Sequence, residues 1–152
     1  MRKRCRRKVY ALVNPITMAI EGAAITDTAA LDKLRMRELS ALESFRTGKA
    51  TRTDWMDLAD CLNVAQTMGH MGIGPEVLPV CDRAQAALGE AHERFKAGKG
   101  LAFDGPGLAA MRELAEYHDL QRTSISRGEY ERAIKKTGDR IRGAAPDVKV
   151  LI

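Results

Sequence analysis

The chain has 152 residues, with 25 Lys or Arg against 20 Asp or Glu, and a formal net charge of +5. This length indicates one domain, and the 45% apolar and 30% charged content exclude a disordered or fibrous chain. Aromatic residues make up only 5%, so the core must rely on aliphatic side chains and Met, which favours helices over a β-sandwich or barrel.

The chain starts with a basic arm, residues 1–8, which holds six cations and no acid. Residues 9–120 carry 11 positive and 16 negative charges, and residues 121–152 carry 8 and 4. Two basic ends therefore flank an acidic middle. This layout is typical of proteins that contact phosphate backbones or other anionic surfaces, although a short basic run can also be a solubilising tail.

Residues 9–152 are predicted to form a single helical domain. A short strand-like run, 9–13, leads to Asn14-Pro15, which are suited to the N-cap and the first position of a helix over about 15–25. Its apolar residues recur on one face, and Glu21 is its only charged residue. We expect this helix to be well buried.

Three further helices follow, at about 28–47, 54–68 and from Pro75 to Gly98. Asp27 or Thr28 is predicted to cap the first of them, and the second follows Thr53. In the third, Pro79 is expected to delay the regular helix by a turn. Its apolar residues alternate spacings of four and three, the pattern of antiparallel helix packing: Val77, Cys81, Ala84, Leu88, Ala91 and Phe95.

The last two helices are predicted at about 107–122 and from Ser126 to Ile141. Ser126 and Glu129 match a capping box. One side of the last helix is apolar, and we place its cations on the other side: Arg132, Lys135, Lys136, Arg140 and Arg142. A second strand-like run, 148–152, could pair with the first. The predicted fold is all-α, a single-domain bundle of about six helices with at most two short terminal strands.

No motif for catalysis, for a metal or for a cofactor emerges. The three cysteines are far apart and odd in number, which fits a reducing cytoplasm, and Cys61 and Cys81 are expected to be small core residues. None of the three histidines has a metal-binding partner at helical spacing, and His118 is expected to be a hydrogen-bonded core or interface histidine. Catalytic residues, metal ligands and cofactors are all predicted to be absent, so an enzyme is not expected. No apolar run is long enough for a membrane span.

Two segments, 6–16 (RRKVYALVNPI) and 120–130 (LQRTSISRGEY), resemble a set of small uncharacterised proteins from proteobacterial phages and prophages. The resemblance implies no reaction and transfers no catalytic residue. It implies a setting among the accessory genes of mobile elements, whose products often bind host or phage machinery stoichiometrically.

Two functional hypotheses follow. The first is a non-enzymatic binding module that contacts nucleic acid, or a host nucleoprotein complex, through its basic ends. The second is a protein-directed inhibitor of a host defence or regulatory system, an anti-defence protein, for which the charges are incidental. The first hypothesis assigns these nucleic-acid-binding residues: Arg2, Lys3, Arg4, Arg6, Arg7, Arg132, Lys136 and Arg140.

Overall fold

The computed structural model describes residues 15–144, of which 80% are helical, in agreement with the predicted all-α fold. The basic arm and both strand-like runs lie outside the described residues. Within them, the only β-type contact is an isolated bridge between Ile25 and Ser126. The elements are α1 (Pro15–Ala23), α2 (Thr28–Arg46), α3 (Arg52–His70), the 3-10 turn η1 (Pro75–Val77), α4 (Leu78–Lys96), α5 (Gly105–Thr123) and α6 (Arg127–Arg142).

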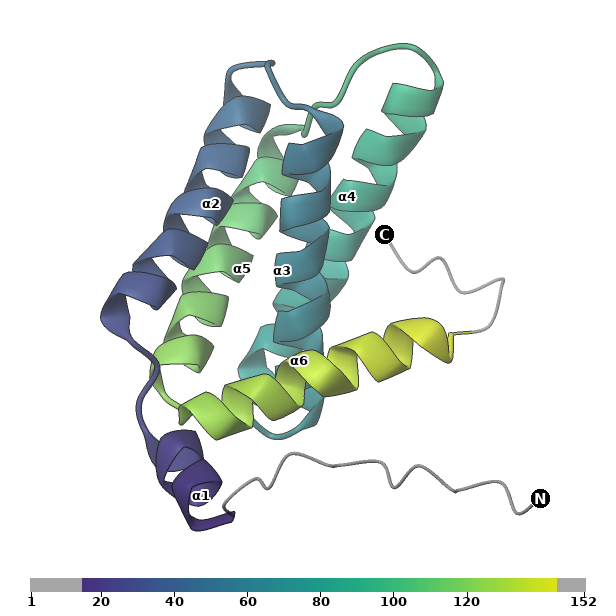
Figure 1. Ribbon diagram of the computed structural model, residues 1–152. Coiled ribbons are helices and arrows are strands. Elements are labelled where there is room, and N and C mark those ends of the chain that lie inside the picture. The colour runs from purple at the N-terminus through teal and green to yellow at the C-terminus, as the bar shows by residue number, and fades with distance from the viewer. Residues whose placement is uncertain (1–14, 145–152) are drawn as a thin grey trace, which may run out of the picture.

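Four helices of 19 residues each, α2 to α5, form an antiparallel bundle in which every helix packs on its sequence neighbour and α5 returns to α2 (Figure 1). The sixth helix crosses one end of this bundle and packs on α3, and α1 packs on α6. No helix within residues 15–144 combines the length and the apolarity that a membrane span needs.

Side-chain caps fix where the helices begin. Ser126 and Glu129 form the predicted capping box, in which each side chain bonds the other residue's backbone N–H. Helix α3 begins two residues earlier than predicted, because Thr51 and Asp54 form a second capping box. Asp27 caps α2, as expected. Local hydrogen bonding thus sets these starts before any helix packs on another.

Helices α2 and α4 end in the same way, at a glycine with positive φ. Gly48 has φ 71° and Gly98 has φ 74°, a conformation that side chains with a Cβ adopt only at a cost. The N–H of the following residue, Lys49 or Lys99, then bonds a carbonyl five residues back, at 2.9 and 3.0 Å respectively. This is the Schellman motif, and it confirms both predicted helix ends.

The predicted α4 seam forms one wall of the core. Its first five positions, from Val77 to Ala91, are buried, whereas Phe95 is 48% exposed near the helix end. Leu88 is fully buried, and its carbonyl oxygen accepts a hydrogen bond of 3.1 Å from the indole Nε1 of Trp55 on α3. The regular helix starts only after the η1 turn, which confirms the delay predicted from Pro79.

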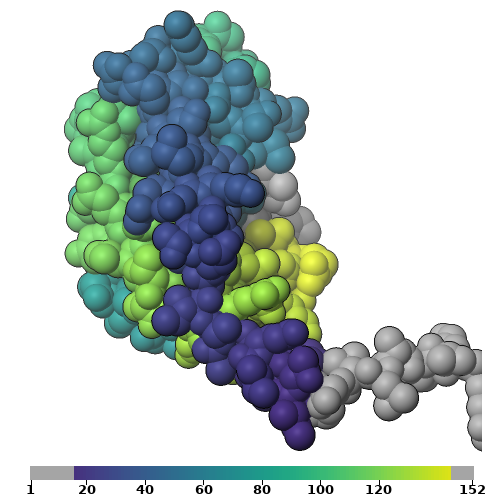
Figure 2. Space-filling view, turned by 60° about the vertical axis from the view of Figure 1, so that its left-hand side comes forward, coloured from purple at the N-terminus to yellow at the C-terminus, as the bar shows by residue number. Residues whose placement is uncertain are grey.

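The first helix differs from the prediction that it is well buried. Ile16, Met18 and Ile20 are 71%, 59% and 68% exposed, and Figure 2 shows α1 at the lower end of the body, outside the bundle. It contacts α6 through glycines: a Cβ on Gly128 would lie 2.8 Å from the carbonyl oxygen of Gly22. The side of α1 that faces α6 is the one with Gly22, so its large apolar side chains lie outside this contact and remain exposed.

We expect Leu88→Ala to lower the free energy of unfolding by about 2–5 kcal/mol, because the site is fully buried and the substitution removes apolar contacts and leaves a cavity. The matched control is Phe95→Ala, on the same seam but half exposed, which should cost less than half as much. Urea denaturation followed by circular dichroism measures both. Equal costs would mean that the seam does not form the core.

Candidate functional site

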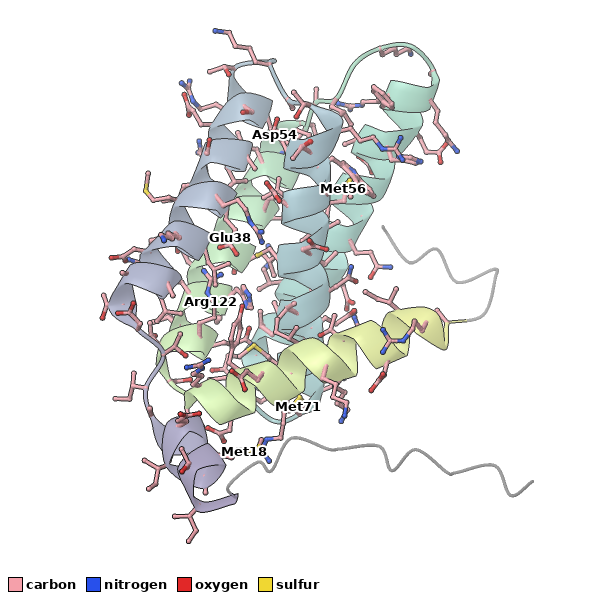
Figure 3. All side chains as sticks on the ribbon, viewed as in Figure 1. Met18, Glu38, Asp54, Met56, Met71 and Arg122 are labelled. Carbon is pink, nitrogen blue, oxygen red and sulfur yellow. The ribbon has the colours of Figure 1, made fainter. Side chains whose placement is uncertain are left out.

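A buried ion pair joins α2 to α5. Arg122 donates from Nη1 to Glu38 Oε1 at 2.6 Å and from Nη2 to Glu38 Oε2 at 2.9 Å. The two side chains are 1% and 3% exposed and point toward one another in Figure 3. Burial alone lowers the pKa of Arg122, but the hydrogen-bonded carboxylate of Glu38 outweighs it, so the net pKa is raised. Arg122 is therefore charged inside the bundle.

Asp119 extends the ion pair toward the surface. Its carboxylate lies 3.5 Å from Arg122 Nη2 and also accepts a hydrogen bond from Arg35 on α2. One donor of the cluster is left over, because Arg122 Nε is buried and has no hydrogen-bond acceptor among the described residues. Such buried donors are rare in folded proteins, since each one costs free energy.

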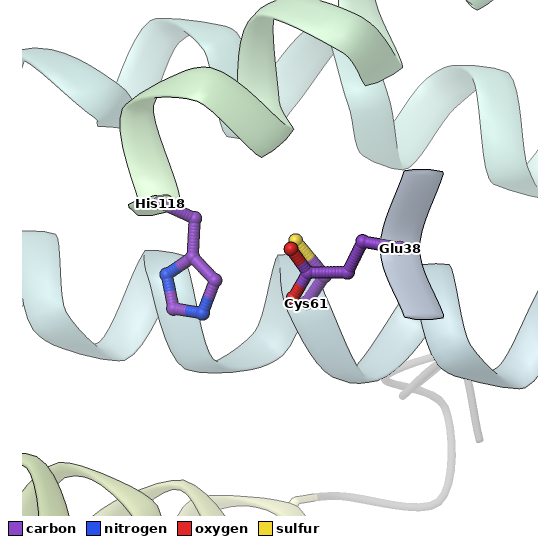
Figure 4. A group of neighbouring side chains, drawn as sticks. All are labelled: Glu38, Cys61 and His118. Atoms are coloured by element: carbon purple, nitrogen blue, oxygen red, sulfur yellow. The ribbon is translucent and has the colours of Figure 1, made fainter. Parts of the chain in front are cut away.

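Cys61 of α3 and His118 of α5 lie beside the Glu38 carboxylate (Figure 4). Each of these three buried residues offers one metal-ligating atom, and these atoms all lie within 4.8 Å of one another. We call Glu38, Cys61 and His118 the buried triad. The sequence predicted no such site, because its members are 23 and 57 residues apart and come from three helices.

The imidazole of His118 is held in one orientation by Gln121. The Gln121 amide Nε2 donates to the carbonyl oxygens of Ala65 at 3.2 Å and Ile73 at 2.7 Å, which turns its Oε1 toward His118 Nδ1, 3.2 Å away. Because Oε1 can only accept, Nδ1 carries the proton and Nε2 keeps a lone pair. This confirms the prediction that His118 is a hydrogen-bonded core histidine.

The environment makes the two other titratable groups neutral. Burial, and then the charge of Arg122, lower the pKa of His118 to about 4. Burial, and then the charge of Glu38, raise the pKa of the Cys61 thiol well above its ordinary value. A protonated thiol is a poor nucleophile, so Cys61 is not poised for attack on a substrate.

A cavity of about 280 Å³ adjoins the buried triad, and all three of its members line it. Arg122 lines the same cavity, and α6 supplies the facing wall with Tyr130 and Thr137. Helix α6 therefore borders a cavity of mixed polar and apolar lining with one face and presents its other face to solvent.

The exposed face of α6 carries three cations that form no ion pair with any residue in 15–144: Arg132, Lys135 and Lys136. We call these three residues the α6 basic face. Arg127 and Arg142, near the ends of the helix, pair with Glu131 and Asp139 on the same helix. The predicted basic residues of the arm, at positions 2–7, lie outside the described residues.

Arg140 differs from the expectation that it shares this exposed face. It is half-buried, and its Nη2 donates to the backbone oxygen of Asn63 at 3.2 Å. It lies seven residues, two helical turns, after Ala133, so it falls on the same inward stripe as Ala133 and Thr137. Burial accordingly lowers its pKa. In this position it packs against α3.

No family model, no curated protein and no solved structure matches the chain. The resemblance to phage proteins therefore stays a prediction, and the site has to be interpreted from its own chemistry.

We expect Glu38→Met and Arg122→Met each to lower the free energy of unfolding by about 3–5 kcal/mol, because either change leaves a buried charge without its partner. The double variant should cost clearly less than the sum, since no unpaired charge remains. Urea denaturation of all four proteins gives the coupling energy.

The exposed pair of Arg83 and Glu113, 2.9 Å apart, is the control. Replacing either residue with Met should change the free energy of unfolding by less than about 1 kcal/mol. Additive costs for the buried pair would show that Glu38 and Arg122 do not depend on each other.

Proposed function

We propose that the protein is a non-enzymatic binding module of a phage or another mobile element, and that it contacts nucleic acid or a nucleic-acid-containing complex through its basic segments. The α6 basic face and the basic arm would both contact phosphates. These contacts would depend on charge and would be independent of the base sequence of the nucleic acid.

The observation that carries this proposal is the group of exposed cations without ion pairs on the α6 basic face. Arg132, Lys135 and Lys136 lie within little more than one helical turn, are exposed, and form no ion pair within residues 15–144; Glu129, one turn before Arg132, acts on it only through a longer-range charge interaction. The cations at both ends of the helix are neutralised by their own neighbours, so the middle of α6 is where a polyanion gains most. The six cations of residues 1–8 add a second segment of the same sign.

Elementary electrostatics gives the expected behaviour. A cation that approaches a phosphate displaces condensed counterions, and their release into solution drives binding. Affinity then falls linearly with the logarithm of the salt concentration, and the slope counts the phosphates neutralised. Such contacts need charge more than a planar fork, so Lys and Arg are nearly equivalent in this role.

The slope of log affinity against log salt concentration is about −0.9 for each phosphate contact on duplex DNA. We therefore expect the triple variant Arg132→Gln, Lys135→Gln, Lys136→Gln, which loses three contacts, to reduce the magnitude of this slope by about 2–3. The matched control removes three exposed cations elsewhere, Lys33→Gln, Lys49→Gln and Lys99→Gln, so the net charge falls equally. Its slope should stay close to that of the natural chain. Fluorescence anisotropy over a salt series measures both variants.

Equal slopes for the two triple variants would show that only the overall charge matters, and would remove α6 from the proposal.

The arm makes a separate prediction. Replacing Arg2, Lys3, Arg4, Arg6 and Arg7 with Gln should reduce the salt slope by about 4–5 if all five contact phosphates. The melting temperature should hardly change, because charged residues at a chain end that repel one another contribute little to packing. A large fall in the melting temperature would assign the arm a structural role instead.

A second candidate function is the protein-directed inhibitor, and the exposed apolar surface of α1 favours it. Met18 and Ile20 are 59% and 68% exposed, and Ile25, just beyond the helix, is 79% exposed. Exposed large apolar side chains that gather in one region of a surface are typical of protein-binding sites. If no nucleic acid binds at low salt, the protein-directed inhibitor becomes the leading proposal. The test is co-purification from the host with the natural chain and with the Ile20→Asp variant as baits, where a host protein retained by the natural chain and lost with the variant would support it.

A further inference from the structure

We propose that the buried triad, Glu38, Cys61 and His118, is a binding site for a divalent transition-metal ion, with Zn²⁺ the ion that best suits its ligands. This site is independent of the basic surface and of the function proposed above.

The chemistry of the donors points to zinc. A carboxylate oxygen, a cysteine sulfur and an imidazole nitrogen are its three usual protein ligands, whereas Ca²⁺ and Mg²⁺ take oxygen ligands almost exclusively. Ligands of tetrahedral zinc lie about 3.4–3.8 Å from one another, given metal–ligand distances of about 2.0–2.3 Å. The donor atoms of the buried triad already lie within 4.8 Å of one another, so side-chain adjustments of about 1 Å would complete the geometry.

The surroundings of two ligands match those of metal sites. Metal-binding histidines donate their other ring N–H to an oxygen, and the Gln121 amide accepts this bond from His118. Metal-binding carboxylates are held by hydrogen bonds, as Arg122 holds Glu38. Each Glu38 oxygen accepts one of these bonds. Glu38 also interacts with the Cys61 thiol by a side-chain hydrogen bond, which is given up when a metal ion displaces the thiol proton and which frees a lone pair for the ion. The bond between His118 and Gln121 and those from Arg122 to Glu38 can stay.

The charge balance also allows a divalent ion. Its two positive charges would be offset by the Glu38 carboxylate and by a Cys61 thiolate, which a bound metal ion stabilises. Arg122 would then have to share Glu38 with the metal. A second carboxylate is already in place for it, since Asp119 lies 3.5 Å from its Nη2.

The cavity gives an independent reason to expect a bound species. Three protein ligands leave one position of a tetrahedral ion open, and all three triad members line a cavity of about 280 Å³. Arg122 lines it too, and its buried Nε has no acceptor among the described residues. A water or small anion on the fourth position would sit in this cavity, where it could accept that hydrogen bond.

The test is a titration of the full chain, first stripped with a chelator, with Co²⁺ as a spectroscopic probe for the zinc position. We expect a thiolate-to-cobalt charge-transfer absorption that saturates at one equivalent and disappears when Zn²⁺ displaces the Co²⁺. Cys61→Ser should abolish this absorption, and His118→Gln should weaken Co²⁺ binding at least tenfold.

The chain supplies its own matched controls. Cys81→Ser removes the other buried cysteine of the described residues, and Cys5→Ser removes the thiol of the arm, so both should keep the full absorption. Circular dichroism shows whether each variant is folded. If Cys61→Ser does not fold, the comparison of the natural chain with the double variant Cys5→Ser, Cys81→Ser decides, since Cys61 is then the one remaining thiol.

Absence of the absorption in the natural chain at stoichiometric Co²⁺ would overturn the proposal, as would its persistence in folded Cys61→Ser or its loss in the double variant. The buried triad would then be only a hydrogen-bonded part of the core.

Discussion

The ion pair between Glu38 and Arg122 is the constraint on which the arrangement of the bundle depends. Two charges taken out of water cost several kcal/mol unless each meets its partner in good geometry. The planar guanidinium and carboxylate meet through two parallel hydrogen bonds, so α2 and α5 have one register that satisfies both. Apolar side chains in the same places would tolerate a sliding or rotated helix at much lower cost.

The same pair organises the polar interior around it. It brings the Glu38 carboxylate beside Cys61, and it places a positive charge near His118, which adds to the larger effect of burial in lowering the pKa of that imidazole. From the following turn of α5, Gln121 bonds the backbone of α3 and of the loop after it. Helices α2, α3 and α5 thus share one hydrogen-bonded network, and the cavity lies where α6 closes over it.

Helix α6 borders the cavity on one side and carries the α6 basic face on the other. Its inner stripe, with Ala133 and Thr137 buried, packs against the bundle and walls the cavity, while Lys135 and Lys136 face solvent. Arg140 lies on this inner stripe, so it is half-buried although it belongs to a basic helix. The position of a cation around the helix, rather than its residue type, decides whether it is exposed.

The sequence by itself determined the helices, because their starts and ends depend on contacts within a few residues. The capping box at Ser126 and the glycines after α2 and α4 act through hydrogen bonds within a few residues. Along α4, apolar residues at alternating spacings of four and three mark the buried face. One signal of the buried site was also present. Glu38 occupies a position on an otherwise apolar stripe of α2, between Leu31 and Phe45, and Arg122 follows Met111, Ala115 and His118 on the buried stripe of α5.

Tertiary structure alone decided which residues meet. Glu38, Cys61 and His118 come from three helices and have no characteristic spacing, so only the packing of α2, α3 and α5 brings them together. It also decided the exposure of α1: an apolar helix is buried only if a partner covers its face, and α1 meets α6 through backbone at Gly22 and Gly128. Helix formation is a local equilibrium, whereas burial and ligand clusters depend on contacts between distant parts of the chain, which a sequence pattern does not encode.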